Sequence, residues 1–133
     1  MYKFLIFSIC GYFLYKGQSD VVGTWITCNE NNSYYTSDTI IFSDNVNYYY
    51  NNNCCRFIEW KINAKKMIFS NNHLCNEPPV KKSEERKIKY RNEVIEVYLG
   101  NKMEERFKVI DINKKEIEEY PYLIRELTLW RLK

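Results

Sequence analysis

The sequence predicts an all-β protein, an antiparallel up-and-down β-barrel of about 8–10 strands. Short segments in which apolar and polar residues alternate recur along the chain, separated by clusters of Asn, Asp, Ser and Gly. The segments alternate instead of forming continuous apolar runs, which is typical of antiparallel sheets with one face in water. Closing the sheet into a barrel is how a single domain hides so many strand edges.

The first 19 residues have the layout of a cleaved secretory signal peptide. Lys3 supplies a positive charge, residues 4–15 are apolar and uncharged, and Gly17-Gln18-Ser19 offers small residues for cleavage. The apolar stretch is shorter than the roughly 20 residues that span a bilayer, so we expect no membrane span. The sequence therefore predicts an exported protein, periplasmic or secreted, whose barrel domain covers residues 20–133.

Two alternatives concern the same leader. It could be an uncleaved anchor helix, or it could belong to a lipoprotein acylated at Cys10. Ile9 argues against acylation, because it is bulky where a small residue is wanted, and the apolar run continues past the cysteine.

Charge argues against nucleic acid as a partner. Two of the 20 basic residues and none of the 17 acidic residues belong to the leader, which leaves 18 basic against 17 acidic, or +1. A domain so close to neutral attracts neither nucleic acid nor an anionic membrane.

The four cysteines outside the leader predict two disulfides, because an even number in an exported chain is typical of a disulfide framework. Neighbours such as Cys54 and Cys55 bridge each other only with strain. Cys28 and Cys75 are therefore each expected to pair with one of these two, and both connectivities remain open. Zinc is the rival ligand, but the spacing lacks two C-x-x-C knuckles.

Five strands are predicted in the first half of the domain. The first carries Gly23-Thr24-Trp25, whose indole has to be buried by the strands that follow. The second is rich in β-branched residues, and the third is a tyrosine run between a Ser-Asp-Asn turn and an Asn-rich loop. The fourth places Ile58, Trp60 and Ile62 on one face, and a short turn joins it to the fifth. The ranges are 21–28, 36–42, 46–50, 56–62 and 67–69.

The second half is predicted to hold a long loop and five further strands. Periodicity disappears over residues 70–85, where Asn and Pro accumulate, so this segment is expected to be a loop anchored by Cys75. Residues 114–125 could form a charged helix, but Pro121 within them favours strands. The strands are expected at 86–91, 93–99, 105–112, 115–120 and 123–132.

No catalytic constellation stands out, so we expect a protein that is not an enzyme and has no cofactor or metal. His73 is the only histidine. The acidic residues come as adjacent pairs, which point to opposite faces of a strand. The serines lack a nucleophile elbow, and no glycine-rich loop could hold a phosphate.

Aromatic residues offer the one candidate binding surface. They could line a pocket for an apolar ligand, although packing in the core is the simpler interpretation, because a barrel of this size has little spare volume. The candidates are Phe42, Tyr48, Tyr50, Trp60 and Phe69.

Gly23-Thr24-Trp25 resembles the G-x-W motif of the lipocalins, and most closely that of the small exported lipocalin-like proteins of Bacteroidota. Residues 39–42, residues 60–69 and the ending Leu127-Thr128-Leu129-Trp130-Arg131 resemble later parts of that family. The resemblance implies that Gly23 and Trp25 form the structural motif, in which Trp25 closes one end of the barrel. It also implies that Arg131 packs over the indole, with Arg125 less well placed for this role.

A lipocalin-like barrel implies that the protein binds or shields something. The first hypothesis is a small hydrophobic molecule held at the open end away from Trp25. The alternative is a periplasmic protein that blocks a target protein, such as a lysozyme or protease inhibitor or an immunity protein. In that case residues 70–85 would be the contact element.

Overall fold

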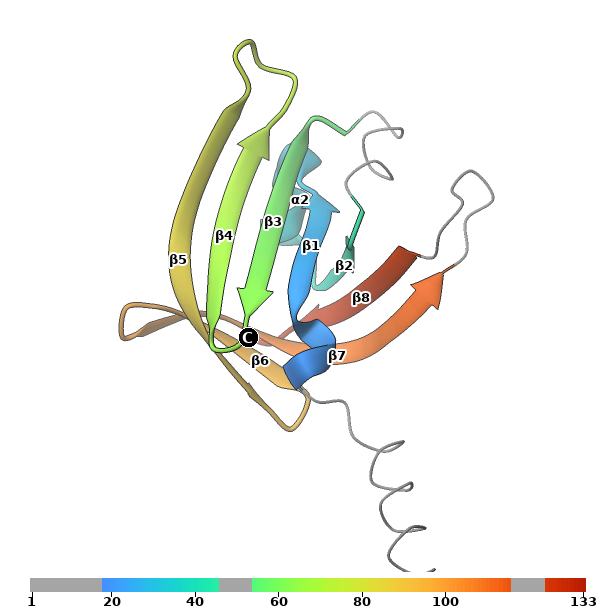
Figure 1. Cartoon of the computed structure of the whole chain (residues 1–133), viewed down its shortest axis with the longest axis vertical. Coiled ribbons are helices and arrows are strands. Elements are labelled where there is room, and N and C mark those ends of the chain that lie inside the picture. The colour runs from blue at the N-terminus through green and yellow to red at the C-terminus, as the bar shows by residue number, and fades with distance from the viewer. Residues whose placement is uncertain (1–17, 46–53, 116–123) are drawn as a thin grey trace, which may run out of the picture.

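The computed structural model describes residues 18–45, 54–115 and 124–133, which are nearly all β (Figure 1). The predicted signal peptide, the predicted strand at 46–50 and nearly all of that at 115–120 lie outside these ranges. The elements in chain order are η1 (Gln18–Val21), β1 (Gly23–Cys28), η2 (Glu30–Asn32), α2 (Ser33–Thr36), β2 (Thr39–Ser43), β3 (Arg56–Asn63), β4 (Lys66–His73), β5 (Val80–Arg91), β6 (Val94–Leu99), β7 (Lys102–Lys115) and β8 (Ile124–Arg131).

The eight described strands close into an antiparallel barrel in the order β1-β2-β8-β7-β6-β5-β4-β3. The prediction of an all-β antiparallel barrel is therefore confirmed. Strands β3 to β8 form the expected up-and-down meander. The order departs from a simple meander at β1, which lies between β2 and β3. Its pairing with β3 runs from Gly23 opposite Ile62 to Cys28 opposite Phe57. It pairs with β2 where Ile26 lies opposite Ser43.

The barrel interior is filled by side chains. Phe42 and Trp60 have ring centroids 4.6 Å apart, and the Phe107 centroid lies 5.3 Å from that of Trp60. Tyr34 completes the group at 6.4 Å from Trp60. Aromatic pairs at these separations add stability beyond the burial of their area. The expected burial of Trp25 is confirmed, since its ring is 0% exposed and its Nε1 donates to the Val21 carbonyl at 2.8 Å.

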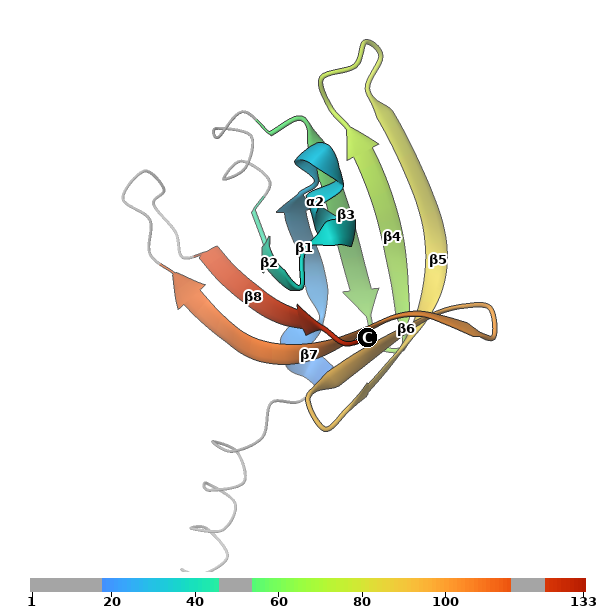
Figure 2. The same ribbon diagram turned by 180° about the vertical axis from the view of Figure 1, so that it is seen from behind.

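A short helix that the sequence analysis missed lies against the inner side of the barrel wall. Figure 2 shows α2 in front of β1 and β3, and from this position its Tyr34 enters the core. The prediction that a strand begins at Thr36 is wrong, because Thr36 ends α2 and β2 begins at Thr39. Four residues are too few to display a helical period in sequence.

Strands β4 and β5 form a hairpin that projects beyond the other strands (Figures 1 and 2). The prediction of a loop over residues 70–85 is wrong. The antiparallel pairing of β4 with β5 runs from Lys66 opposite Lys87 to His73 opposite Val80. Apolar and polar residues do not alternate here, because such alternation arises only where one face of a strand packs on a core. The far end of this hairpin extends past the aromatic core, so polar residues occupy both of its faces.

The cysteines pair as Cys28–Cys54 and Cys55–Cys75. The prediction that Cys54 and Cys55 each bind one distant cysteine is confirmed, and the structure selects one of the two connectivities. The first bridge joins β1 to the segment before β3. The second joins that segment to the turn of the β4–β5 hairpin. Two disulfides point to an oxidising environment.

Removing the second bridge by the double substitution Cys55→Ser and Cys75→Ser is expected to lower the free energy of unfolding by about 3 kcal/mol. The reason is that the bridge closes a chain segment with a separation of 20 residues, which restricts the unfolded state. Urea unfolding monitored by circular dichroism measures the difference. Thiol titration of the oxidised wild type should find none of these four cysteines reactive, and a loss below about 1 kcal/mol would contradict the account.

Candidate functional site

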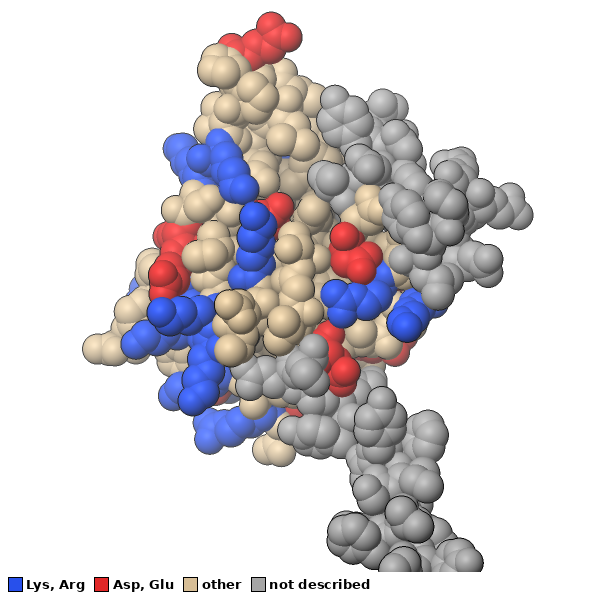
Figure 3. Space-filling model, in the orientation of Figure 1, with Lys and Arg blue, Asp and Glu red and all other residues tan. Residues whose placement is uncertain are grey.

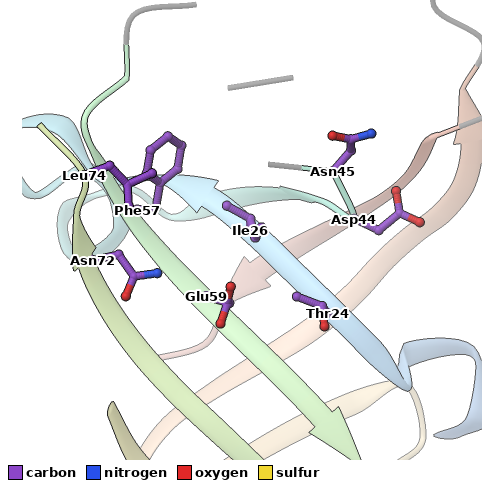
Figure 4. A pocket seen from close by; sticks show the side chains of 8 residues that line it. All are labelled: Thr24, Ile26, Asp44, Asn45, Phe57, Glu59, Asn72 and Leu74. Atoms are coloured by element: carbon purple, nitrogen blue, oxygen red, sulfur yellow. The ribbon is translucent and has the colours of Figure 1, made fainter. Parts of the chain in front are cut away.

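A groove lies on the outer face of the barrel, over β1, β3 and β4 (Figure 4). Its volume is about 510 Å³, within the roughly 300–1,000 Å³ range of ligand-binding sites. Figure 3, in the orientation of Figure 1, shows Lys, Arg, Asp and Glu interspersed around an uncharged area of this face. The groove is lined by Thr24, Ile26, Asp44, Asn45, Phe57, Glu59, Asn72 and Leu74.

Strand alternation determines which side chains reach the groove. Trp25 and Trp60 point into the barrel, so their neighbours along β1 and β3 point outward. Ile26 and Phe57 thereby join Cys54 in a small apolar cluster outside the core, with Leu74 packed against it. The Cys28–Cys54 bridge fixes this cluster at one end of the groove.

Two buried acceptor atoms in the groove lack a hydrogen-bond donor: Oε1 of Glu59 and Oδ1 of Asn72. Asn72 is only 9% exposed. The ammonium groups of Lys61 and Lys81 lie 3.8 and 3.6 Å from Glu59 Oε1, which balances its charge but exceeds hydrogen-bond distance. A buried acceptor without a donor is costly, so a ligand that supplies donors here would gain free energy.

The motif tryptophan is covered by a different arginine from the predicted one. The Arg125 guanidinium lies 4.7 Å from the Trp25 ring, and Asp44 holds it through Oδ2 at 3.1 Å. Gly23 is required beside it, because φ is +137° and an added Cβ would approach the Arg125 guanidinium to 2.8 Å. The assignment of Arg131 to this role is wrong. Sequence alone could not separate the two arginines, since both lie on β8.

Arg131 instead belongs to a buried polar cluster that holds α2 in the barrel. Glu105 accepts hydrogen bonds from the Tyr34 hydroxyl at 2.9 Å and from Arg86 at 3.1 Å, and it pairs with Arg131. Arg131 also donates to the carbonyls of Tyr34 and Ser37, so it ties the end of α2 to β8. We interpret the cluster as structural, because Glu105 pairs with both arginines and Glu84 gives Arg86 a second carboxylate.

The Tyr34 hydroxyl should make the fold sensitive to alkali. Burial raises its pKa well above the ordinary value of about 10, and the neighbouring Glu105 carboxylate raises it further. Above pH ~10 the unfolded chain loses this proton while the folded chain keeps it, so stability falls as pH rises. We expect Tyr34→Phe to show a shallower decline of unfolding free energy above pH ~10 than the wild type.

Urea unfolding monitored by circular dichroism at a series of pH values measures this decline in unfolding free energy. The matched control is Tyr35→Phe, whose ring is half exposed and which should change the slope less. Parallel declines in the wild type and Tyr34→Phe would contradict the assignment.

The predicted aromatic ligand wall is not assembled as one pocket in the described residues. Phe42 and Trp60 are part of the filled core, and Phe69 packs against Tyr34 with centroids 5.9 Å apart. Phe69 also borders a smaller depression of about 210 Å³, lined by residues of α2, β4 and β5. Tyr48 and Tyr50 lie outside the described residues.

The groove residues were missed because they lie on the strand faces predicted to be wet. One indication was available in the sequence. Ile26 and Phe57 are apolar at positions where the alternation along β1 and β3 predicts outward-facing side chains. His73 ends β4, and within the described residues no group of three His, Cys, Asp or Glu side chains could hold a metal ion. The groove offers hydrogen-bond acceptors and apolar contacts, which suit binding.

No helix in the described ranges is both long and apolar enough to cross a membrane. In comparisons with known proteins, no family model, no curated protein and no solved structure matches the chain.

Proposed function

We propose that this is an exported, non-enzymatic, lipocalin-like barrel that binds a target protein, in the manner of an inhibitor or immunity protein. The observation that carries the proposal is the filled interior combined with a groove on the outer face. A barrel packed with Phe42, Trp60 and Phe107 leaves little room for a small molecule along its axis. A partner therefore has to be met from outside.

The β4–β5 hairpin supports this proposal. It projects beyond the barrel next to the groove, to which it contributes Asn72 and Leu74 (Figures 1 and 4). The Cys55–Cys75 bridge anchors its turn to the segment before β3. A hairpin that is held in place loses less conformational entropy on binding than a free loop.

Export is supported by the leader-like N-terminal sequence and by the two disulfides. The hypothesis of a small apolar ligand at the open end is less well supported. Tyr34 fills the interior beside Trp60, and its hydroxyl bonds to Glu105, which pairs with Arg86 and Arg131. Such a charged cluster does not favour an apolar molecule.

The test is to express the tagged protein in its own host and to analyse the purified material by native mass spectrometry. We expect a protein partner that wild type retains and Leu74→Glu loses, because a charge is placed on the apolar end of the groove. The control is Ile68→Glu, which lies on the same face of β4 but outside the groove. A bound lipid or small molecule in place of a protein would contradict the proposal.

A further inference from the structure

We propose that the outer groove binds an extended peptide segment of the partner through neutral N–H donors and one apolar side chain. This inference rests on the proposed function and specifies the chemistry of the partner's segment. The N–H groups would satisfy Glu59 and Asn72, and the apolar side chain would pack against Ile26 and Leu74.

The two acceptors are spaced as an extended peptide requires. Asn72 is the direct cross-strand partner of Phe57, and Glu59 lies two residues further along the same strand as Phe57. Diagonal neighbours of this kind are about 7–8 Å apart across an antiparallel pair. In an extended segment, N–H groups two residues apart point to the same side and are separated by roughly 6.6 Å. Successive same-side N–H groups can thus reach both acceptors.

Charge favours neutral donors over a lysine or arginine. Glu59 already has Lys61 and Lys81 within 4 Å, and Asp44 is bonded to Arg125. An added cation would approach these positive groups, whereas a backbone N–H donates a hydrogen bond and brings no charge. The two groove atoms without a hydrogen-bond donor, Glu59 Oε1 and Asn72 Oδ1, are both acceptors. A ligand that carries only acceptors therefore cannot form hydrogen bonds with them.

The apolar end of the groove limits the size of the segment. Figure 4 shows Phe57 and Leu74 together at one end, Ile26 in the centre, and Asp44 and Asn45 on the opposite side. Leu74 is partly exposed, whereas Ile26 is only 6% exposed. A volume of about 510 Å³ accommodates a few residues, of which one can place its side chain at the apolar end.

The experiment is a selection of random heptapeptides on phage against the immobilised oxidised protein, followed by titration of synthetic peptides. We expect the enriched sequences to share an apolar residue and to be poor in Lys and Arg. N-methylation of the contacting peptide nitrogens should weaken binding about tenfold, because it removes a donor. Asn72→Leu should weaken binding by a similar factor, since it removes an acceptor.

Two variants control for folding and for position. Asn72→Gln keeps a neutral amide acceptor at this position and should retain binding. Asn71→Leu alters the adjacent residue, which points to the opposite face of β4 and borders the smaller depression, and it should leave binding unchanged. Unfolding curves for all three variants verify that they are folded before binding is compared.

Three results would overturn the inference: enrichment of basic peptides, equal binding by the N-methylated peptides, or no enriched peptide at all. Concentration-dependent dimers that Asn72→Leu abolishes would also overturn it, because the occupant would then be a second copy of the chain. The proposed function is judged separately by the host experiment. If a protein partner is retained there while no peptide is enriched, the function stands and only the peptide inference fails.

Discussion

Replacing Trp25 by alanine is expected to lower the free energy of unfolding by about 3–5 kcal/mol, as for other buried tryptophan truncations. The ring is 0% exposed and belongs to the continuous core cluster of the barrel. Its loss also removes the Nε1 hydrogen bond to Val21 and leaves the Arg125 guanidinium without its aromatic partner. Domains have only about 5–15 kcal/mol in total, so this variant should be close to unfolded.

Urea unfolding monitored by circular dichroism measures the effect, with Trp130→Ala as the control. Trp130 is 48% exposed on the outer face of β8, so its truncation should cost less than about 1 kcal/mol. Similar losses for both tryptophans would mean that the ring of Trp25 is not sealed in the core.

Replacing Glu105 by alanine is expected to cost about 3–5 kcal/mol, because it leaves the largely buried charge of Arg131 without a carboxylate and Arg86 with Glu84 alone. The side chains of Arg86 and Arg131 are 11% and 17% exposed, and Glu105 itself is 10% exposed. The Tyr34 hydroxyl would lose its acceptor at the same time. The result should be release of α2 from the barrel as well as lower stability.

The matched control is Glu104→Ala, the exposed neighbour, which should change stability by less than about 0.5 kcal/mol. Glu105→Gln keeps the shape without the charge and should fall between the two. Denaturant unfolding gives the free energies, and hydrogen exchange at Tyr34 reports on α2. A loss for Glu105→Ala as small as that for Glu104→Ala would contradict the role assigned to this cluster.

The strands that face the core could be predicted from the sequence because their pattern is local. Ile58, Trp60 and Ile62 alternate with polar residues, and all three are buried on β3. The same rule failed for residues 70–85, where the hairpin extends past the core, and for α2, which is a single turn. In the hairpin the stabilising contacts are the backbone pairs between β4 and β5, such as His73 with Val80, which leave no apolar period in the sequence. For α2 the stabilising contact comes from a residue distant in the chain, Glu105 for Tyr34.

The candidate site was less predictable than the fold. Glu59 and Asn72 were two polar residues among many, and nothing local in the sequence shows that their acceptor atoms would be buried without donors. That property depends on how the side chains of β1, β3 and β4 lie beside one another on the outer face of the barrel. Burial of polar atoms is set by tertiary contacts, which a linear pattern does not contain.

By itself the sequence determined that the chain forms an antiparallel barrel, that Trp25 is buried, and that Cys54 and Cys55 each bond to a distant cysteine. These follow from alternation, side-chain size and the geometry of adjacent cysteines, all of which act over a few residues. Only the tertiary structure decided which arginine covers Trp25, where β1 enters the barrel, and that the groove lies outside. Those outcomes depend on strand order and register, because these alone determine which distant side chains meet.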